Sequence, residues 1–137
     1  MTEEMRKDIL RRCERFKDTF FRVRIWATSI EMKMPIRFKN GHVLQLYFSQ
    51  ERDKIRISDY GNIAAHNNLD LSEVKKLCRR RNLKIERCEE FDRPGRPYLG
   101  IYAIVEPRDL NNAVWSIISV MRDSFQMAKT KREYKHE

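Results

Sequence analysis

Residues 30–58 read IEMKMPIRFKNGHVLQLYFSQERDKIRIS, and this stretch decides the fold. Apolar and polar residues alternate from Ile30 to Phe38, which is the period of a half-buried β-strand. Asn40-Gly41 then supplies two residues that tolerate a positive φ in a tight hairpin turn. A second strand is expected from His42 to Ser49 and a third from Lys54 to Ser58. The stretch therefore predicts a three-stranded antiparallel meander.

Proline at position 35 adds a condition to the first of these strands. Pro35 has no backbone N–H, so it cannot donate to a neighbouring strand. Such a residue is tolerated when its strand lies at the edge of the sheet, or when its nitrogen faces away from the ladder. The sequence leaves both arrangements open.

Three helical patterns surround the meander and provide apolar faces for it. The first helix begins after Thr2, which can cap it, and the middle helix begins at Asp70, which forms a capping box with Glu73. The last helix begins at Pro107. The apolar stripes are Met5, Ile9, Cys13, Phe16 and Phe20 in the first helix, Leu71, Val74, Leu77 and Cys78 in the second, and Leu110, Val114, Ile117, Ile118, Met121 and Phe125 in the third.

Two more strands are expected, at 83–88 and 98–105, and they can pair as a second hairpin across a loop rich in Pro and Gly. Residues 21–26 fit either a short strand or the end of the first helix. We therefore predict an α+β fold. Its antiparallel sheet, the meander plus the second hairpin, packs against N-terminal, middle and C-terminal helices. Residues 1–127 are expected to form a single domain, and residues 128–137 a polar, frayed C-terminal tail.

Composition limits the class of protein. The chain has no apolar stretch of the ~18 residues that span a bilayer, and its N-terminus is polar, so we expect a cytoplasmic protein with no membrane partner. Cys13, Cys78 and Cys88 are odd in number and widely spaced, which favours reduced, buried thiols. Lys and Arg number 29 against 20 Asp and Glu, a net charge of +9. Such a surface attracts nucleic acid, an acidic protein or an anionic lipid surface.

The excess positive charge is dispersed along the chain, and its most suggestive local cluster lies on the predicted middle helix and just after it. Positive side chains one turn apart can displace counterions from a polyanion with little sequence preference. The alternative is a solvated face, since Lys and Arg are good helix formers. Arg22 and Arg24, beside Trp26, form a possible second patch of the kind used in single-strand binding, although Trp26 also suits a core position. The residues of the main cluster are Lys75, Lys76, Arg79, Arg80, Arg81 and Lys84.

Signatures of catalysis and of metal binding are missing from the sequence. None of the three histidines lies at ligand-pair spacing from a cysteine or carboxylate, and there is no phosphate loop, nucleophile elbow or HExxH motif. We therefore expect no enzyme activity, no metal and no cofactor. A metal-dependent nuclease built on Asp59, Glu86 and Lys84 is the enzymatic alternative. Asp59 also suits a role in its turn, accepting a hydrogen bond from a downstream N–H.

The leading hypothesis is a non-enzymatic binding module that engages nucleic acid or a ribonucleoprotein through the basic helix. The alternative is an inhibitor or adaptor that docks on an acidic surface of a host protein. For that alternative, Trp115 and the 98–105 strand could provide an apolar edge, and the strand is available for pairing if nothing covers it. The other interpretation is that Trp115 and Tyr102 complete the core.

The order of features from about residue 25 to residue 125 resembles an uncharacterised bacterial and phage domain family. Pro35 and Phe38 match a strand that ends in a Pro-aromatic pair, and residues 57–61, Ile-Ser-Asp-Tyr-Gly, match an Asp-x-Gly turn. Met34 and Ile36 depart from the threonine and phenylalanine that flank the proline in the family. The resemblance implies a compact α+β module often carried on mobile elements, with no established activity. It therefore suggests a phage or host-defence role without naming a mechanism.

Overall fold

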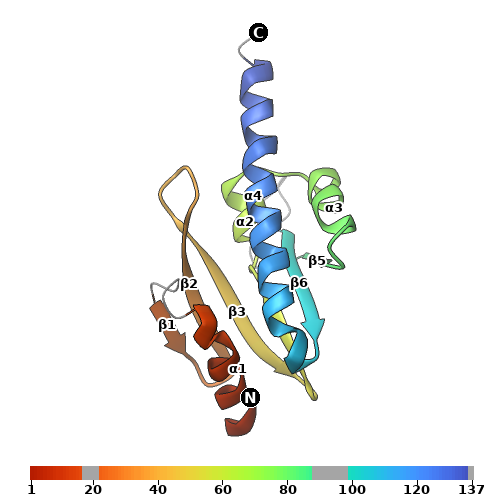
Figure 1. The fold of residues 1–137 in the computed structure, drawn as a ribbon. Coiled ribbons are helices and arrows are strands. Elements are labelled where there is room, and N and C mark those ends of the chain that lie inside the picture. Colours follow the sequence, from red (N-terminus) through yellow and green to blue (C-terminus); the bar gives the residue numbers. More distant parts are fainter. Residues whose placement is uncertain (17–21, 88–98, 136–137) are drawn as a thin grey trace.

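The computed structural model describes residues 1–16, 22–87 and 99–135, which form a helical layer against a six-stranded antiparallel sheet of order β1-β2-β3-β4-β6-β5 (Figure 1). The α+β prediction is confirmed. The strands are β1 (Arg22–Ile25), β2 (Ser29–Arg37), β3 (Val43–Glu51), β4 (Lys54–Ser58), β5 (Lys84–Arg87) and β6 (Leu99–Val105). The helices are α1 (Glu3–Arg12), α2 (Asn62–His66), α3 (Leu71–Arg79) and α4 (Leu110–Lys135), with 3-10 turns η1 (Cys13–Phe16) and η3 (Pro107–Asp109).

The meander and the second hairpin both form as the alternation predicts. Ile30 pairs with Phe48, and Phe48 pairs with Ile57, so apolar residues of three strands share one face. β5 and β6 pair antiparallel, and β6 also pairs with β4, which joins the hairpin to the meander in one sheet. β1 is a strand rather than the end of a helix, and it pairs with β2.

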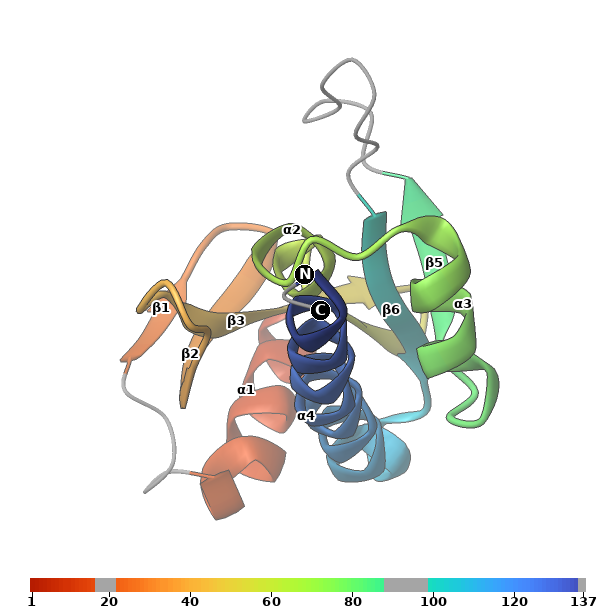
Figure 2. The same ribbon diagram turned by 90° about the horizontal axis from the view of Figure 1, so that it is seen from above.

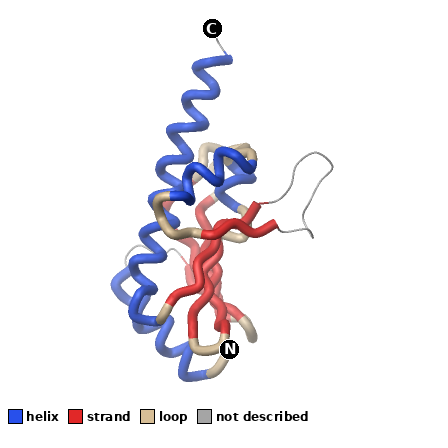
Figure 3. Tube along the Cα trace, turned by 90° about the vertical axis from the view of Figure 1, so that its right-hand side faces the viewer, coloured by secondary structure: helices blue, strands red, loops and turns tan. Residues whose placement is uncertain are grey.

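Only one face of the sheet carries helices (Figure 3). Buried side chains from alternate positions of the strands merge there with those of the helices into one core. We call the opposite surface, on which none of the described helices lies, the outer face. The strand residues in the core are Ile30, Met32, Met34, Leu44, Leu46, Phe48, Ile55, Ile57, Leu99, Ile101 and Ala103.

Pro35 lies in an interior strand, at a point where the sheet tolerates it. The pairing of β1 with β2 ends at Lys33, so no carbonyl of β1 needs a backbone N–H donor from position 35. The β2–β3 register shifts between Lys33 and Arg37, which places Pro35 within an irregularity of that ladder. A bulge is one of the few sites where a strand accommodates proline, because regular pairing is already interrupted.

Two helix starts follow the predicted caps, whereas α4 begins at Leu110, after the 3-10 turn η3 that starts at Pro107. Thr2 Oγ1 accepts a hydrogen bond from the backbone N–H of Met5 at 3.1 Å, which caps α1. Asp70 and Glu73 form the full capping box of α3. The first helix ends earlier than its apolar stripe suggested, since α1 gives way to η1 at Cys13, and Phe20 lies outside the described residues.

The frayed tail expected after Met127 is instead helical, because α4 continues to Lys135 and projects past the sheet (Figure 1). Residues 128–135 read AKTKREYK. This segment has no Gly or Pro and consists mostly of good helix formers, so nothing in it ends a helix that is already nucleated. Within the described residues, no helix combines the length and apolarity needed to cross a membrane.

Candidate nucleic-acid interface

Helix α3 separates its side chains as predicted, with apolar residues inward and cations outward. Val74, Leu77 and Cys78 are buried, and α3 packs beside β5 and β6 at one end of the sheet (Figure 2). We call the four exposed cations of this helix and its C-cap, Lys75, Lys76, Arg79 and Arg80, the α3 basic face. Lys76 and Arg79 lie in the last turn of α3, where the helix dipole favours positive charge.

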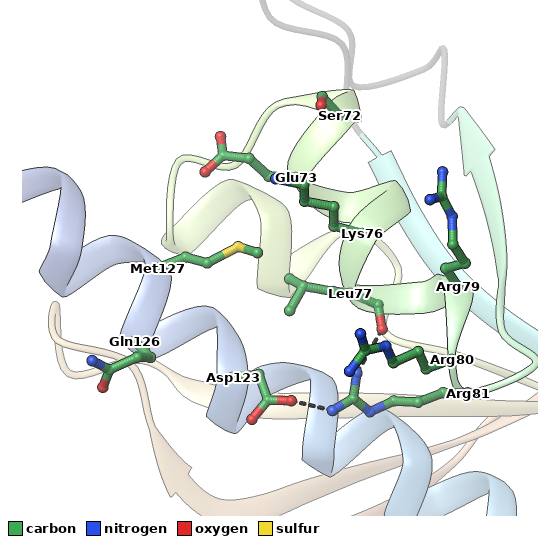
Figure 4. A pocket seen from close by; sticks show the side chains of 10 residues that line it. All are labelled: Ser72, Glu73, Lys76, Leu77, Arg79, Arg80, Arg81, Asp123, Gln126 and Met127. Carbon is green, nitrogen blue, oxygen red and sulfur yellow. Dashed lines mark hydrogen bonds and ion pairs between the residues drawn. The ribbon is translucent and has the colours of Figure 1, made fainter.

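A groove of about 780 Å³ lies between α3 and α4, and cations of the α3 basic face line it (Figure 4). Lys76, Arg79 and Arg80 contribute from the α3 side, whereas Leu77 and Met127 supply apolar surface. The groove thus joins positive charge to an apolar floor. Its remaining lining residues are Ser72, Glu73, Arg81, Asp123 and Gln126.

Arg81 differs from the other cations of the predicted cluster, because it is engaged in holding α3 against α4. Its guanidinium donates to the carbonyl of Leu77 at 2.7 Å and forms an ion pair with the carboxylate of Asp123 (Figure 4). The side chain is only 23% exposed. A phosphate would have to compete with both partners, so the geometry gives Arg81 a positioning role.

Lys84, Arg22 and Arg24 are not part of the α3 basic face. Lys84 is exposed on β5 and pairs with Tyr102, which places it on the outer face. Arg22 and Arg24 belong to β1, the strand at the opposite edge of the sheet. The guanidinium carbon of Arg24 lies 5.4 Å from the ring centre of Trp26. Trp26 is 48% exposed, so it is not a core residue.

Asp59 is a structural residue of the turn after β4. Its side chain is 0% exposed, and one oxygen accepts hydrogen bonds from the N–H groups of Gly61 and Ile101, at 2.9 and 2.8 Å. The other accepts from Ile63 N–H at 2.9 Å. Burial raises the pKa of Asp59 to about 6, while these hydrogen bonds act in the opposite direction. The predicted turn-stabilising role is confirmed.

The three residues of the nuclease alternative do not converge. Asp59 faces the core, whereas Lys84 and Glu86 pair with Tyr102 and Gly100 on the outer face. The Glu86 carboxylate is engaged by Arg56. Within residues 1–16, 22–87 and 99–135, no group of three His, Cys, Asp or Glu side chains is placed to hold a metal ion.

Two of the three cysteines are described by the structure. Cys13 and Cys78 are buried free thiols, as predicted, and Cys88 lies outside the described residues.

The apolar edge considered for a protein partner does not form. β6 pairs on both sides, with β4 and β5, so it offers no free edge to a partner. Trp115 is 55% exposed and does not complete the core.

A row of side chains across the outer face was not predicted from the sequence. Side chains from all six strands align across the sheet through consecutive pairings, and we call this line the outer-face row. Residues far apart in the chain meet in it, so a local pattern cannot reveal it. The row runs Arg24, Glu31, Tyr47, Ser58, Tyr102 and Lys84.

Comparison with known protein families, with curated proteins and with solved structures gives no match for this chain.

Proposed function

We propose that this chain is a non-enzymatic nucleic-acid-binding protein that contacts phosphates through the α3 basic face, with little preference for base sequence. The observation that carries the proposal is that none of Lys75, Lys76, Arg79 and Arg80 forms an ion pair with any described residue. They are exposed on less than two turns of one helix and its C-cap. Phosphates would supply the missing anions, and the release of counterions would drive binding.

Helix α1 provides a comparison within the same chain. Its arginines are matched to acids, since Arg6 pairs with Glu3 and both Arg11 and Arg12 pair with Asp8. Helix α3 has one carboxylate of its own, Glu73, and that group is occupied by the capping box. The arginines of α1 are thus matched to acids, whereas the four cations of the α3 basic face are clustered without one, which favours a bound anion over a solvated face.

An acidic surface of another protein is the second candidate partner. The groove beside α3 has an apolar floor, Leu77 and Met127, next to its cations. A protein can fill such a floor with an apolar side chain while its carboxylates meet the cations, whereas a phosphate backbone uses the cations alone. This arrangement is the one observation that favours an adaptor or inhibitor.

The resemblance to the bacterial and phage domain family supports a role on a mobile element. A ribonucleoprotein is included in the proposal, because its RNA presents the same phosphates to the α3 basic face. The Asp-x-Gly turn that carries the resemblance is explained by the fold. Asp59 accepts a hydrogen bond from Gly61 N–H, and Gly61 has a φ of +84°, a conformation that glycine adopts without strain. The motif therefore supports a shared architecture and says nothing of a shared site.

Charge reversal on α3 tests the proposal. The variant K75E/K76E/R79E/R80E is titrated against a fluorescently labelled generic duplex at low salt, with fluorescence anisotropy as the readout. We expect binding to weaken by on the order of 100-fold, because four phosphate contacts are replaced by four repulsions. The side chains are exposed, so circular dichroism should show the same fold and a similar melting temperature.

A matched variant separates location from total charge. K7E/K39E/R52E/R108E reverses four exposed cations that are scattered over the chain. Four reversals of two charges each lower the net charge from +9 to +1, as they do in the α3 variant. The proposal predicts a much smaller loss of affinity for this control. Equal losses in the two variants would contradict a localised interface, and a wild-type chain that does not bind would contradict the proposal itself.

Nuclease treatment separates the two candidate partners. A tagged chain is used to capture partners from a lysate with and without prior digestion of nucleic acid. Loss of all captured material after digestion supports the nucleic-acid proposal. A protein that remains bound after digestion and is released by the α3 charge reversal supports the acidic-protein candidate instead.

A further inference from the structure

Planar groups lie both in the outer-face row and directly beside it. The rings of Tyr47 and Tyr60 are 5.2 Å apart, and the guanidinium of Arg56 lies 4.2 Å from the ring centre of Tyr102. At the β1 end, Arg24 lies against Trp26. With neighbouring strands about 4.8 Å apart, the row extends over roughly 24 Å. Rings and stacked guanidinium planes are the surfaces on which unpaired bases stack.

Sheet stability explains only part of this arrangement. Tyr47 and Tyr102 belong to regular strand pairs, where aromatic side chains commonly stabilise neighbours. Tyr60 and Trp26 lie beyond the ends of β4 and β1, and they are 45% and 48% exposed. Their exposed ring surface contributes little to the core, so a role in binding accounts for it better.

The charges of the outer face are arranged to favour an anion. The carboxylates are engaged, since Arg56 contacts Glu51 and Glu86, and the indole N–H of Trp26 donates to Glu31 at 3.2 Å. In contrast, three cations on this face have no ion-pair partner among the described residues. These cations are Arg24, Lys33 and Lys84, so both ends of the outer-face row are positive.

We propose that the outer face binds single-stranded nucleic acid, with bases stacked along the outer-face row and phosphates directed to Arg24, Lys33 and Lys84. This inference rests on the proposed function and names its substrate class. A duplex keeps its bases stacked on one another and cannot use the rings, whereas a single strand can. β5 is the strand at this edge of the sheet and α3 packs against it, so a single strand that leaves the row at Lys84 can pass around the edge onto the α3 basic face.

The test compares a labelled oligothymidylate with a labelled duplex on the same protein. The wild-type chain is expected to prefer the single strand. In Y47L/Y102L, leucine keeps apolar bulk but removes two stacking surfaces, and single-strand affinity should fall roughly 25-fold, about 5-fold for each ring. Duplex affinity should not change. W115L serves as the matched control, because it removes an exposed aromatic ring from α4, on the other side of the sheet.

Photocrosslinking keeps the inference testable if Y47L/Y102L proves unfolded by circular dichroism. An oligonucleotide containing 5-bromodeoxyuridine is crosslinked to the wild-type chain, and the modified residues are mapped by mass spectrometry. Crosslinks at Tyr47, Tyr60, Tyr102 or Trp26 support the inference. Crosslinks found only elsewhere, or equal affinity for single strand and duplex, overturn it. Duplex binding that depends on α3 would then leave the proposed function standing, whereas a chain that binds neither probe contradicts both.

Discussion

Replacing Asp59 by Asn is predicted to change how the stability of the fold depends on pH. Asp59 is fully buried, and burial raises its pKa from the ordinary value of 3.8 to about 6. Between these two values the folded protein retains a proton that the unfolded chain releases. Stability from this group is therefore fully present below about pH 4 and is lost as the pH rises through about 6.

The size of the effect follows from the same two values. The interval from 3.8 to about 6, at 1.36 kcal/mol for each pH unit, corresponds to about 3 kcal/mol in the free energy of unfolding. Asn does not titrate, so D59N removes this dependence. The asparagine side chain has a single acceptor oxygen, so the Ile63 N–H loses its partner. This loss lowers the free energy of unfolding by about 1–3 kcal/mol at every pH.

Urea unfolding followed by circular dichroism checks this prediction at several pH values between about 4 and about 7. The difference in unfolding free energy, D59N minus wild type, should become more positive by about 3 kcal/mol as the pH rises across this range. A constant difference would refute the raised pKa. A difference that changes in the opposite direction would show that the hydrogen bonds from Gly61, Ile63 and Ile101 outweigh burial.

Two further predictions concern residues that the structure assigns to stability. R81M should lower the free energy of unfolding by about 1 kcal/mol, since it removes a partly exposed ion pair with Asp123, and thermal melting would measure this loss. In a fluorescence anisotropy titration, R81M should weaken duplex binding less than R80E does. Burial raises the pKa of Cys13 to about 12 and that of Cys78 to about 11. In a C88S variant, neither thiol should therefore react with DTNB near pH 8 until urea is added. Rapid reaction in the native state would contradict their burial.

Local sequence patterns were sufficient for most of the elements. Alternation from Ile30 to Phe38 determined which side chains enter the core, because a strand turns successive residues to opposite faces. The caps at Thr2 and Asp70 were recognisable because a cap needs only a few neighbouring residues. The α3 basic face was predictable for the same reason, since one helix supplies all four cations.

Arrangements that join distant segments were not predictable in this way. Arg81 looked like one more cation of the cluster, but its partner Asp123 lies 42 residues further along the chain. The position of β6 between β4 and β5 depends on long-range pairing, and it leaves β6 without the free edge that an uncovered strand would offer. The outer-face row, which draws one residue from each strand, depends on the whole strand order.

The salt dependence of duplex binding tests the central claim, that the cations of the α3 basic face contact phosphates, most directly. Four contacts predict a slope of about −3.6 for the logarithm of the association constant against the logarithm of salt concentration, or a loss of roughly 150-fold between about 50 and 200 mM. R80E should bring the slope to about −2.7. A slope shallower than about −1, or one that R80E leaves unchanged, would contradict the account.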